Sequence, residues 1–230
     1  MTYEDTTARD GTTSQATTIW AEELIEDEEM EKVSYFSLFP KLVYSSFLGR
    51  DFTGTEKEYT EILSRNTNRN SSNSISQNIN VLEHPAYADI KNWIIKNLNN
   101  YRDNILNPKF DMEIYLTESW VNYTNQNEQH HPHKHSNSYL SGVFYLNAID
   151  DDTIQFFQDE NLFDIETNKY NLYNCPTWNY PVSTGQLILF PSGIRHGVPM
   201  NPQNKTRISL AFNTFLKGKI SDTRTIGLKI

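Results

Sequence analysis

The residues best suited to chemistry are histidines, and four of the six lie within the segment His130-His-Pro-His-Lys-His135. In an extended backbone alternate side chains project to one face, so we expect His131, His133 and His135 to share a face. Two imidazoles at this spacing can bind one metal ion, and imidazole suits Fe, Zn, Cu and Ni. The segment therefore predicts part of a transition-metal site, although a His-rich tract by itself is also typical of an exposed loop.

A further ligand is predicted where a second apolar segment ends. Residues 185–201 read Gly-Gln-Leu-Ile-Leu-Phe-Pro-Ser-Gly-Ile-Arg-His-Gly-Val-Pro-Met-Asn, so a buried-type strand is followed by a Pro/Gly turn that delivers His196. A rigid strand end can aim such a side chain inward. His196 is therefore the candidate third ligand beside His133 and His135, and the alternative is a structural histidine bonded to a nearby carbonyl.

An arginine lies in the last strand-like segment, where residues 206–213 read Thr-Arg-Ile-Ser-Leu-Ala-Phe-Asn. Arg207 and Ser209 share one face of this strand. A guanidinium in an apolar interior needs a partner, and its planar fork matches a carboxylate in two-point contact. The partner is either the carboxylate of a bound ligand or an Asp or Glu on a facing strand.

The elements that must position these residues are mainly strands. From Met112 onward apolar and polar residues alternate with period two, and Asp, Asn, Gly and Pro separate the segments. Five or more antiparallel strands imply a sandwich, barrel or jelly roll. We therefore predict an α+β fold, mainly β, with a few N-terminal helices packed on the sheet. The expected strands span residues 112–124, 139–147, 153–158, 185–190 and 206–215.

The helices are expected in the N-terminal half. A capping-box pattern at Thr55-Glu-Lys-Glu58 predicts a helix that buries Tyr59, Ile62 and Leu63. Apolar residues recur at helical spacing over residues 85–105, and the proline at the start suits a first helical turn. This longer segment is the clearest helix in the sequence.

Two other N-terminal segments are expected to be less regular. Residues 33–44 predict an edge strand or a bend, because Pro40 interrupts an apolar pattern. Residues 66–78 are rich in Asn and Ser, whose side chains compete with regular backbone bonding, so we expect a loop there. That loop would be either a flexible lid or a connector.

Composition limits the classes of protein to consider. The net charge of −9 opposes a general attraction to nucleic-acid phosphates, although many of the acids are concentrated in residues 22–31. Cys175 is the only cysteine, which excludes an internal disulfide framework and is typical of a reducing compartment. Because the sequence has no stretch of membrane-spanning length and no signal-peptide pattern, we expect a cytoplasmic protein without membrane attachment. Its oligomeric state stays open.

The order and spacing of the motifs resemble the 2-oxoglutarate-Fe(II) oxygenase superfamily, and more narrowly a family of oxygenases found in bacteria and phages. The resemblance covers roughly residues 33–216 and implies that they form the oxygenase domain, between an acidic arm with a short helix (1–32) and a tail (217–230). No single motif is specific, but their order and spacing together are. The motifs are Phe39-Pro40 with Val43, Trp120-Val-Asn122, His133-Lys-His135, Ser141-Gly-Val-Phe-Tyr-Leu146, Phe190-Pro191, His196 and Arg207-Ile-Ser209.

The resemblance implies a double-stranded β-helix (a jelly-roll, cupin-like fold) that holds Fe(II) at the mouth of the barrel and uses 2-oxoglutarate and O2 as co-substrates. The expected reaction is hydroxylation of a substrate C–H bond coupled to decarboxylation of 2-oxoglutarate to succinate. Trp120, Asn122 and Tyr123 are further candidates for lining the pocket. The implied site residues are His133, His135 and His196 for the metal, and Arg207, Ser209 and Tyr145 for the distal carboxylate of 2-oxoglutarate.

One departure concerns the metal ligands. The usual pattern in the superfamily is His-x-Asp or His-x-Glu with a distant His, whereas this chain has His-x-His. The site is then either all-histidine, or Glu128 or another nearby acid supplies an oxygen ligand. The register among the in-phase histidines is also open, and we favour His133 and His135 because they align with the following Ser-Gly strand.

Two other classes fit parts of the pattern. Residues 185–201 nearly reproduce the second cupin signature and His133-x-His135 the first, which would indicate an isomerase or a dioxygenase without a keto acid. A non-catalytic jelly-roll module, serving in binding or structure, is the other alternative. Arg207-x-Ser209 favours the oxygenase, because a cupin has no general need for a guanidinium there. The substrate is left open among a protein side chain, an amino acid, a metabolite and a nucleobase.

Overall fold

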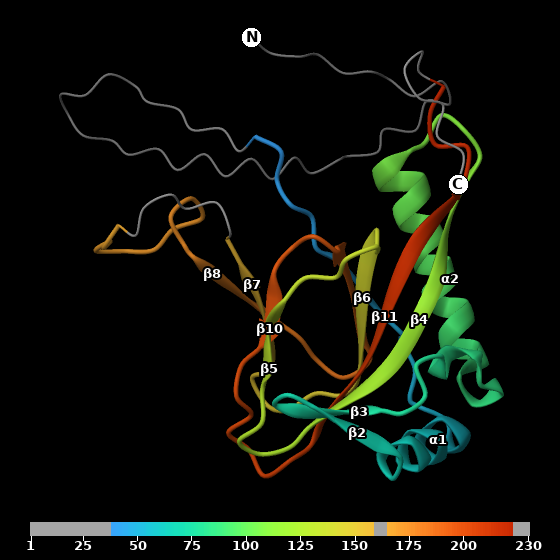
Figure 1. Cartoon of the computed structure of the whole chain (residues 1–230), viewed down its shortest axis with the longest axis vertical. Coiled ribbons are helices and arrows are strands. Elements are labelled where there is room, and N and C mark those ends of the chain that lie inside the picture. Colours follow the sequence, from blue (N-terminus) through green and yellow to red (C-terminus); the bar gives the residue numbers. More distant parts are fainter. Residues whose placement is uncertain (1–37, 159–164, 223–230) are drawn as a thin grey trace. The chain divides into compact units, whose positions relative to one another are not determined.

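A computed structural model describes residues 38–158 and 165–222 of the chain (Figure 1). The chain divides into two units, Met1–Pro40 and Lys41–Ile230, and the second unit contains all the described helices and strands. The predicted acidic arm and its short helix lie outside the described residues, as does most of the predicted C-terminal tail. The predicted domain boundaries therefore stay a prediction.

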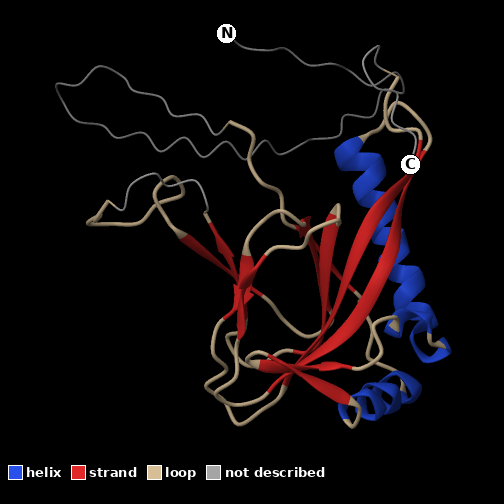
Figure 2. Ribbon diagram, in the orientation of Figure 1, coloured by secondary structure: helices blue, strands red, loops and turns tan. Residues whose placement is uncertain are grey.

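Two antiparallel sheets form the framework of the second unit, as Figure 2 shows. The larger sheet has the strand order β1-β9-β6-β11-β4-β3-β2, and the smaller has the order β5-β10-β7-β8. Antiparallel neighbours that are far apart in sequence, divided over two sheets, are the arrangement of a jelly roll, so the predicted fold class is confirmed. The strands are β1 (Tyr44–Phe47), β2 (Thr67–Asn70), β3 (Asn73–Ser76), β4 (Met112–Thr124), β5 (His130–His133), β6 (Leu140–Asn147), β7 (Thr153–Phe157), β8 (Thr177–Pro181), β9 (Gln186–Pro191), β10 (His196–Val198) and β11 (Arg207–Gly218).

Hydrophobic side chains pack on both faces of the larger sheet. One cluster joins the helices to one face and includes Ile94, Leu98 and Phe212, all fully or almost fully buried. A smaller cluster, which includes Ile154 and Phe190, joins β7 to β9 on the other side. The pocket described below opens within this second, smaller cluster, so the larger core supports the sheet from behind while its inner face stays available for function.

The long helix predicted from residue 85 is confirmed but is composite. After the 3-10 turn η1 (Val81–Glu83), it begins with the 3-10 turn η2 (Pro85–Tyr87), continues as α2 (Ala88–Tyr101) and ends with a π-helical turn, η3 (Arg102–Leu106). Figure 1 shows α2 lying along β4 and β11, against the outer face of the larger sheet. Its apolar stripe packs there, which explains the helical spacing seen in the sequence.

The capping box of α1 (Gly54–Ser64) is not the one predicted. Thr53 is the N-cap: its Oγ1 accepts from the Glu56 backbone N–H at 3.2 Å, and Glu56 Oε2 accepts from the Thr53 N–H at 2.7 Å. The predicted capping box at Thr55 and Glu58 was therefore wrong by two residues. Glu56 also forms an ion pair with Arg50. Tyr59 and Leu63 are buried as expected, whereas Ile62 is 45% exposed.

The Asn- and Ser-rich residues 66–78 form a β-hairpin, so the prediction of a loop was wrong. β2 and β3 pair across a turn in which Ser71 has φ +50°, and β3 continues the sheet beside β4. Ser76 holds that junction, because its Oγ accepts from the Val121 N–H at 3.1 Å. Polar side chains here supplement the strand pairing instead of competing with it. Residues 33–44 were expected to form an edge strand or a bend. Their described part has a bend at Phe39, and β1, at the edge of the larger sheet, begins at Tyr44.

The glycine of the Ser-Gly-Val-Phe-Tyr-Leu segment has a packing role. Gly142 of β6 lies opposite Phe212 of β11, and a Cβ at position 142 would lie 2.1 Å from Cζ of the phenylalanine ring. No side chain can occupy that space. The absence of a side chain at Gly142 therefore lets the ring of Phe212 cross the neighbouring strand.

Candidate metal centre

The inner face of the larger sheet presents polar side chains in register. Thr124 of β4 lies opposite Arg207 of β11, and Ser209 lies between Asn122 of β4 and Tyr145 of β6. Because these residues alternate with buried apolar ones along each strand, they all face the smaller sheet. Arg207 and Ser209 therefore share one face of β11, as the sequence pattern predicted, and polar side chains of β4 and β6 extend the same face on either side.

The three candidate metal ligands come together from two segments of the chain. His196 of β10 lies directly opposite His133 of β5, with ring centroids 4.4 Å apart. His135 follows β5, where its backbone N–H donates to Ser192 O at 3.1 Å, and its ring lies 5.2 Å from that of His196. One ring nitrogen from each of the three residues lies within 4.8 Å of the others. One cation can therefore contact all three imidazoles.

The hydrogen bonds of His133 and His196 set which nitrogen faces the centre. Nδ1 of His133 lies 2.8 Å from the carbonyl of His131, and Nδ1 of His196 lies 2.9 Å from that of Ile194. A carbonyl only accepts, so each Nδ1 carries the hydrogen and each Nε2 keeps its lone pair. This is the tautomer that a metal ligand at Nε2 requires.

His135 is held differently, by a side chain. Its Nδ1 lies 3.2 Å from Nδ2 of Asn213, and that amide nitrogen also donates to Glu118 Oε1 at 2.7 Å. Ser141 Oγ donates to Oδ1 of the same amide at 2.9 Å. A metal bound to Nε2 of His135 would leave a hydrogen on Nδ1, which the amide oxygen can accept and the amide nitrogen cannot. The orientation of Asn213 therefore decides how well His135 suits a metal.

Burial keeps these imidazoles neutral. Desolvation lowers the pKa of His196 to about 3 and that of His135 to about 4, and it also lowers the pKa of His133. The neighbouring imidazoles act in the same direction. Because only a neutral imidazole has a lone pair to donate, the three side chains are in the protonation state that a metal ligand needs at neutral pH.

A fourth histidine enters the pocket in place of the one expected. β10 pairs with β5 through His196 with His133 and Val198 with His130, so His131 and Pro132 of β5 together face the single residue Gly197 of β10, as in a β-bulge. His130 therefore turns inward and stacks on His133 at 4.6 Å, whereas His131 is exposed and does not line the pocket. The ring of His131 lies 5.3 Å from that of His133, as neighbours on one face would, but His131 stays outside the pocket. The bulge brings His130 into the pocket, which strand periodicity alone does not reveal.

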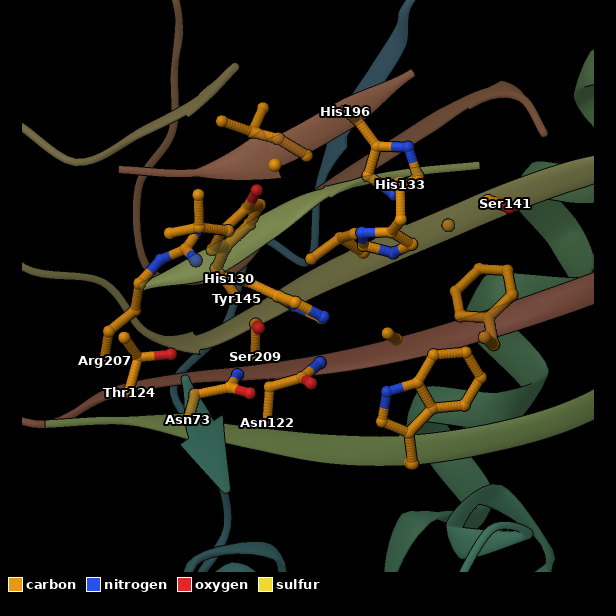
Figure 3. A pocket seen from close by; sticks show the side chains of 18 of the residues that line it. Asn73, Asn122, Thr124, His130, His133, Ser141, Tyr145, His196, Arg207 and Ser209 are labelled. Atoms are coloured by element: carbon orange, nitrogen blue, oxygen red, sulfur yellow. The ribbon is translucent and has the colours of Figure 1, made fainter. Parts of the chain in front are cut away.

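The histidines and the polar residues of the larger sheet line one pocket. Figure 3 shows His133 and His196 on one side and Arg207 and Tyr145 on another. Trp120 and Asn122 also line it. Tyr123, which had been expected there, faces the other way, and its hydroxyl donates to Thr60 O at 2.7 Å.

Arg207 has both a fixed edge and a free one. Its Nε donates to Asp152 Oδ2 at 2.8 Å, and the two side chains are only 3% and 2% exposed. Among the described residues, neither its Nη2 nor the hydroxyl of Tyr145 has a hydrogen-bond partner, although both are buried. The Tyr145 ring lies 5.1 Å from the guanidinium carbon, and burial raises the pKa of its phenol, which stays a neutral donor. A protein carboxylate thus holds one edge of Arg207, and the other is available to a ligand.

Glu128 is occupied elsewhere. One of its oxygens pairs with Arg69 and the other accepts from the Asn125 N–H at 2.8 Å. It does not line the pocket, and no other carboxylate does so within the described residues. The arrangement therefore favours an all-histidine set over a carboxylate from Glu128.

The sequence matches a family model described as "Putative 2OG-Fe(II) oxygenase" over residues 118–213. That range contains the three histidines, Tyr145, Arg207 and Ser209. No relative among curated proteins is detected from the sequence.

Solved structures with the same fold include HygX from Streptomyces hygroscopicus with nickel and 2-oxoglutarate bound, at 14% identity, with 76% of this chain and 82% of that chain covered and a TM-score of 0.54. The prolyl hydroxylase from Trichoplax adhaerens, in complex with a hypoxia inducible factor peptide, has the same identity and coverage and a TM-score of 0.52. The epimerase SnoN from nogalamycin biosynthesis is 12% identical, with 82% of this chain and 89% of that chain covered and a TM-score of 0.54.

At these identities the structural likeness shows the fold, a double-stranded β-helix with several helices packed on one sheet. The family match, over the residues that carry the site, then narrows the assignment. Together, the family match over residues 118–213 and the shared fold support the resemblance to the 2-oxoglutarate-Fe(II) oxygenase superfamily that was predicted from the motifs. Within the part of the chain that the structure describes, no helix has the length and apolar composition needed to cross a membrane.

Proposed function

We propose that this protein is an Fe(II)- and 2-oxoglutarate-dependent oxygenase whose metal ligands are His133, His135 and His196. The observation that carries the proposal is a convergence: three neutral imidazoles and an unpaired edge of a buried guanidinium line the same pocket. When bound, the metal and the keto acid supply the oxidising chemistry, with succinate and CO2 as co-products. The rest of the task falls to side chains of this chain.

The residues present fit the metal. Neutral imidazole is a good ligand for Fe(II), and the backbone carbonyls that accept from His133 and His196 hold both Nε2 atoms toward a common point. An all-histidine set brings no negative charge, so a bound metal keeps more positive charge than with a carboxylate ligand. An anionic co-substrate would therefore be favoured at the remaining positions.

The residues also fit the co-substrate. The free Nη2 of Arg207 and the hydroxyl of Tyr145 are buried donors without partners among the described residues, and they are suited to two oxygens of a carboxylate. Asp152 holds the guanidinium by its other edge, so the donor is fixed before a ligand binds. Ser209 lies beside Tyr145 on the neighbouring strand and is the third candidate donor.

The proposed outcome is hydroxylation of a substrate C–H bond, supported by the motif resemblance. Apolar neighbours of the site, Ile154, Phe190 and Val198, would limit the access of water. The proposal includes a cytoplasmic location, since the single cysteine fits a reducing compartment. Fractionation of cells expressing the chain with an epitope tag tests that location.

Anaerobic binding followed by turnover tests the proposed activity. Protein without a His tag is loaded with Fe(II) and titrated with 2-oxoglutarate, and succinate is then measured after O2 is admitted. We expect one iron per chain, saturable 2-oxoglutarate binding and slow succinate release even without a further substrate. Arg207→Met should retain iron and lose 2-oxoglutarate binding. Metal-loaded protein that neither binds 2-oxoglutarate nor forms succinate would contradict the proposal.

A further inference from the structure

Two buried amide side chains face the pocket beside the proposed co-substrate site. Asn73 of β3 is 0% exposed and Asn122 of β4 is 6% exposed, and both line the pocket. Nδ2 of Asn73 and Oδ1 of Asn122 have no hydrogen-bond partner among the described residues. Buried polar atoms are nearly always paired in native proteins, so this pair calls for a partner that the described residues do not provide.

The hairpin fixes how the two amides are presented. β3 pairs with β4 through Ile75 with Asn122 and Ser74 with Tyr123, which makes Asn73 a diagonal neighbour of Asn122 on the same face. Asn70 Nδ2 donates to Oδ1 of Asn73 at 3.3 Å, so the oxygen of Asn73 is engaged and its nitrogen is left for the pocket. Figure 3 shows the two amide groups next to each other, near Ser209 and His130.

The co-substrate does not satisfy this pair. At neutral pH 2-oxoglutarate carries two carboxylates and a ketone, all of which only accept hydrogen bonds. A donor such as Asn73 Nδ2 can bind them, but Oδ1 of Asn122 is an acceptor and needs an N–H or O–H from its ligand. The ligand of the pair must therefore offer an acceptor and a donor side by side.

We propose that Asn73 and Asn122 form a substrate subsite that binds an amide edge, a carbonyl oxygen next to an N–H, of the molecule to be oxidised. The inference rests on the proposed function and adds the class of substrate. Asn73 would donate to the carbonyl and Asn122 would accept from the N–H, as in a two-point amide pair. Asn73 belongs to the hairpin and lies outside the residues matched by the family model, whereas Asn122 lies within them.

Two sources carry this edge: a primary carboxamide, as in glutamine, and the lactam edge of a pyrimidine. The probes are L-glutamine, uracil and, as the matched control, L-glutamate, which replaces the carboxamide by a carboxylate without a donor. Each is titrated calorimetrically into protein loaded with Ni(II) and 2-oxoglutarate under the same conditions. Ni(II) prevents turnover, so the signal reports binding alone.

We expect L-glutamine or uracil to bind at least about tenfold more tightly than L-glutamate, because an acceptor atom at Asn122 rejects a carboxylate. Whichever of the two binds identifies the source. Asn73→Leu and Asn122→Leu should each weaken that binding about 10- to 100-fold, the loss expected when a buried hydrogen bond to the ligand is not made. Asn68→Ala, an exposed position on the same hairpin, should leave it unchanged.

The same samples separate this inference from the proposed function. Affinities for Ni(II) and 2-oxoglutarate are measured first, and in both asparagine variants they should stay within about twofold of the parent protein. Loss of 2-oxoglutarate binding in the variants would overturn the subsite, because the amides would then serve the co-substrate. Equal or tighter binding of L-glutamate, or no binding of either amide probe, would also overturn it. Failure of the parent protein to bind 2-oxoglutarate would instead overturn the proposed function.

Thermal unfolding checks that each variant is folded. Should Asn73→Leu be unfolded, Asn73→Asp keeps the shape and exchanges the donor for an acceptor. We expect that variant to lose the amide probe while Asn122→Asp, which keeps an acceptor oxygen, retains it. The opposite order would contradict the assigned roles.

Discussion

Replacing Asp152 by alanine removes the carboxylate that holds the Nε edge of Arg207. The two side chains are 2% and 3% exposed and their contact is 2.8 Å, so the change leaves a buried guanidinium without its counter-charge. Breaking a buried pair from one side costs about 3–5 kcal/mol of the free energy of unfolding. For a chain of this size each kcal/mol lowers the melting temperature by about 2–4 °C, so we expect a decrease of about 6–20 °C.

A surface pair in the same region provides the control. Asp150 pairs with Lys205 at 2.9 Å, but their side chains are 75% and 56% exposed. Such a pair contributes about 0–1 kcal/mol, so Asp150→Ala should be close to the parent protein. Urea unfolding followed by circular dichroism measures both variants.

The double variant separates loss of the ion pair from loss of packing. Removing both buried charges is often neutral or stabilising, so Asp152→Ala with Arg207→Met should recover most of the stability lost by Asp152→Ala. A buried ion pair that holds Arg207 is contradicted if Asp152→Ala lowers the free energy of unfolding no more than Asp150→Ala, or if the double variant is no more stable than Asp152→Ala. In either case Arg207 would not depend on Asp152 for its position.

Three other predictions follow from the packing and the histidines. Gly142→Ala should destabilise the protein by about 1–3 kcal/mol, and adding Phe212→Leu should recover part of that loss; an unchanged melting temperature for Gly142→Ala would show that the ring has room. His133→Ala should weaken Ni(II) binding at least tenfold in a calorimetric titration, whereas His131→Ala should not. Equal losses in the two variants would indicate that His131 belongs to the metal ligands. The pKa of His196 is about 3 in the folded, metal-free protein and near 6.5 when unfolded, so the unfolded state binds more protons between these values and stability should fall as pH drops below about 6.5. Urea unfolding at pH 7 and pH 5 measures this fall, and His196→Gln should reduce it; a stability that rises toward pH 5 would contradict the assignment.

Strand periodicity in the sequence was sufficient for the main elements of the larger sheet. β4 has the predicted bounds, and β6, β9 and β11 differ from the predicted ones by three residues or fewer at either end. β5 and β10 were not predicted as strands, because segments of four and three residues are too short to show a period. These two short strands nevertheless bring His133 and His196 together, so the site depends on pairing that only the fold supplies.

Several features of the site could not be predicted for similar reasons. The bulge that turns His130 inward depends on a register shift between β5 and β10. Gly197 leaves room for it, because a Cβ at position 197 would lie only 3.0 Å from the carbonyl oxygen of His130. The pairing of Asp152 with Arg207 joins residues 55 positions apart. The Asn- and Ser-rich hairpin misled the prediction because such residues usually favour loops, and here Asn73 is buried in a strand.

The metal ligands are tested most directly by anomalous diffraction at the iron absorption edge, from crystals loaded anaerobically with Fe(II) and 2-oxoglutarate. We expect a single peak within bonding distance of Nε2 of His133, His135 and His196, with a carboxylate of the co-substrate against the free edge of Arg207. A peak elsewhere, or one bound by a carboxylate of the chain in place of His135, would contradict this expectation.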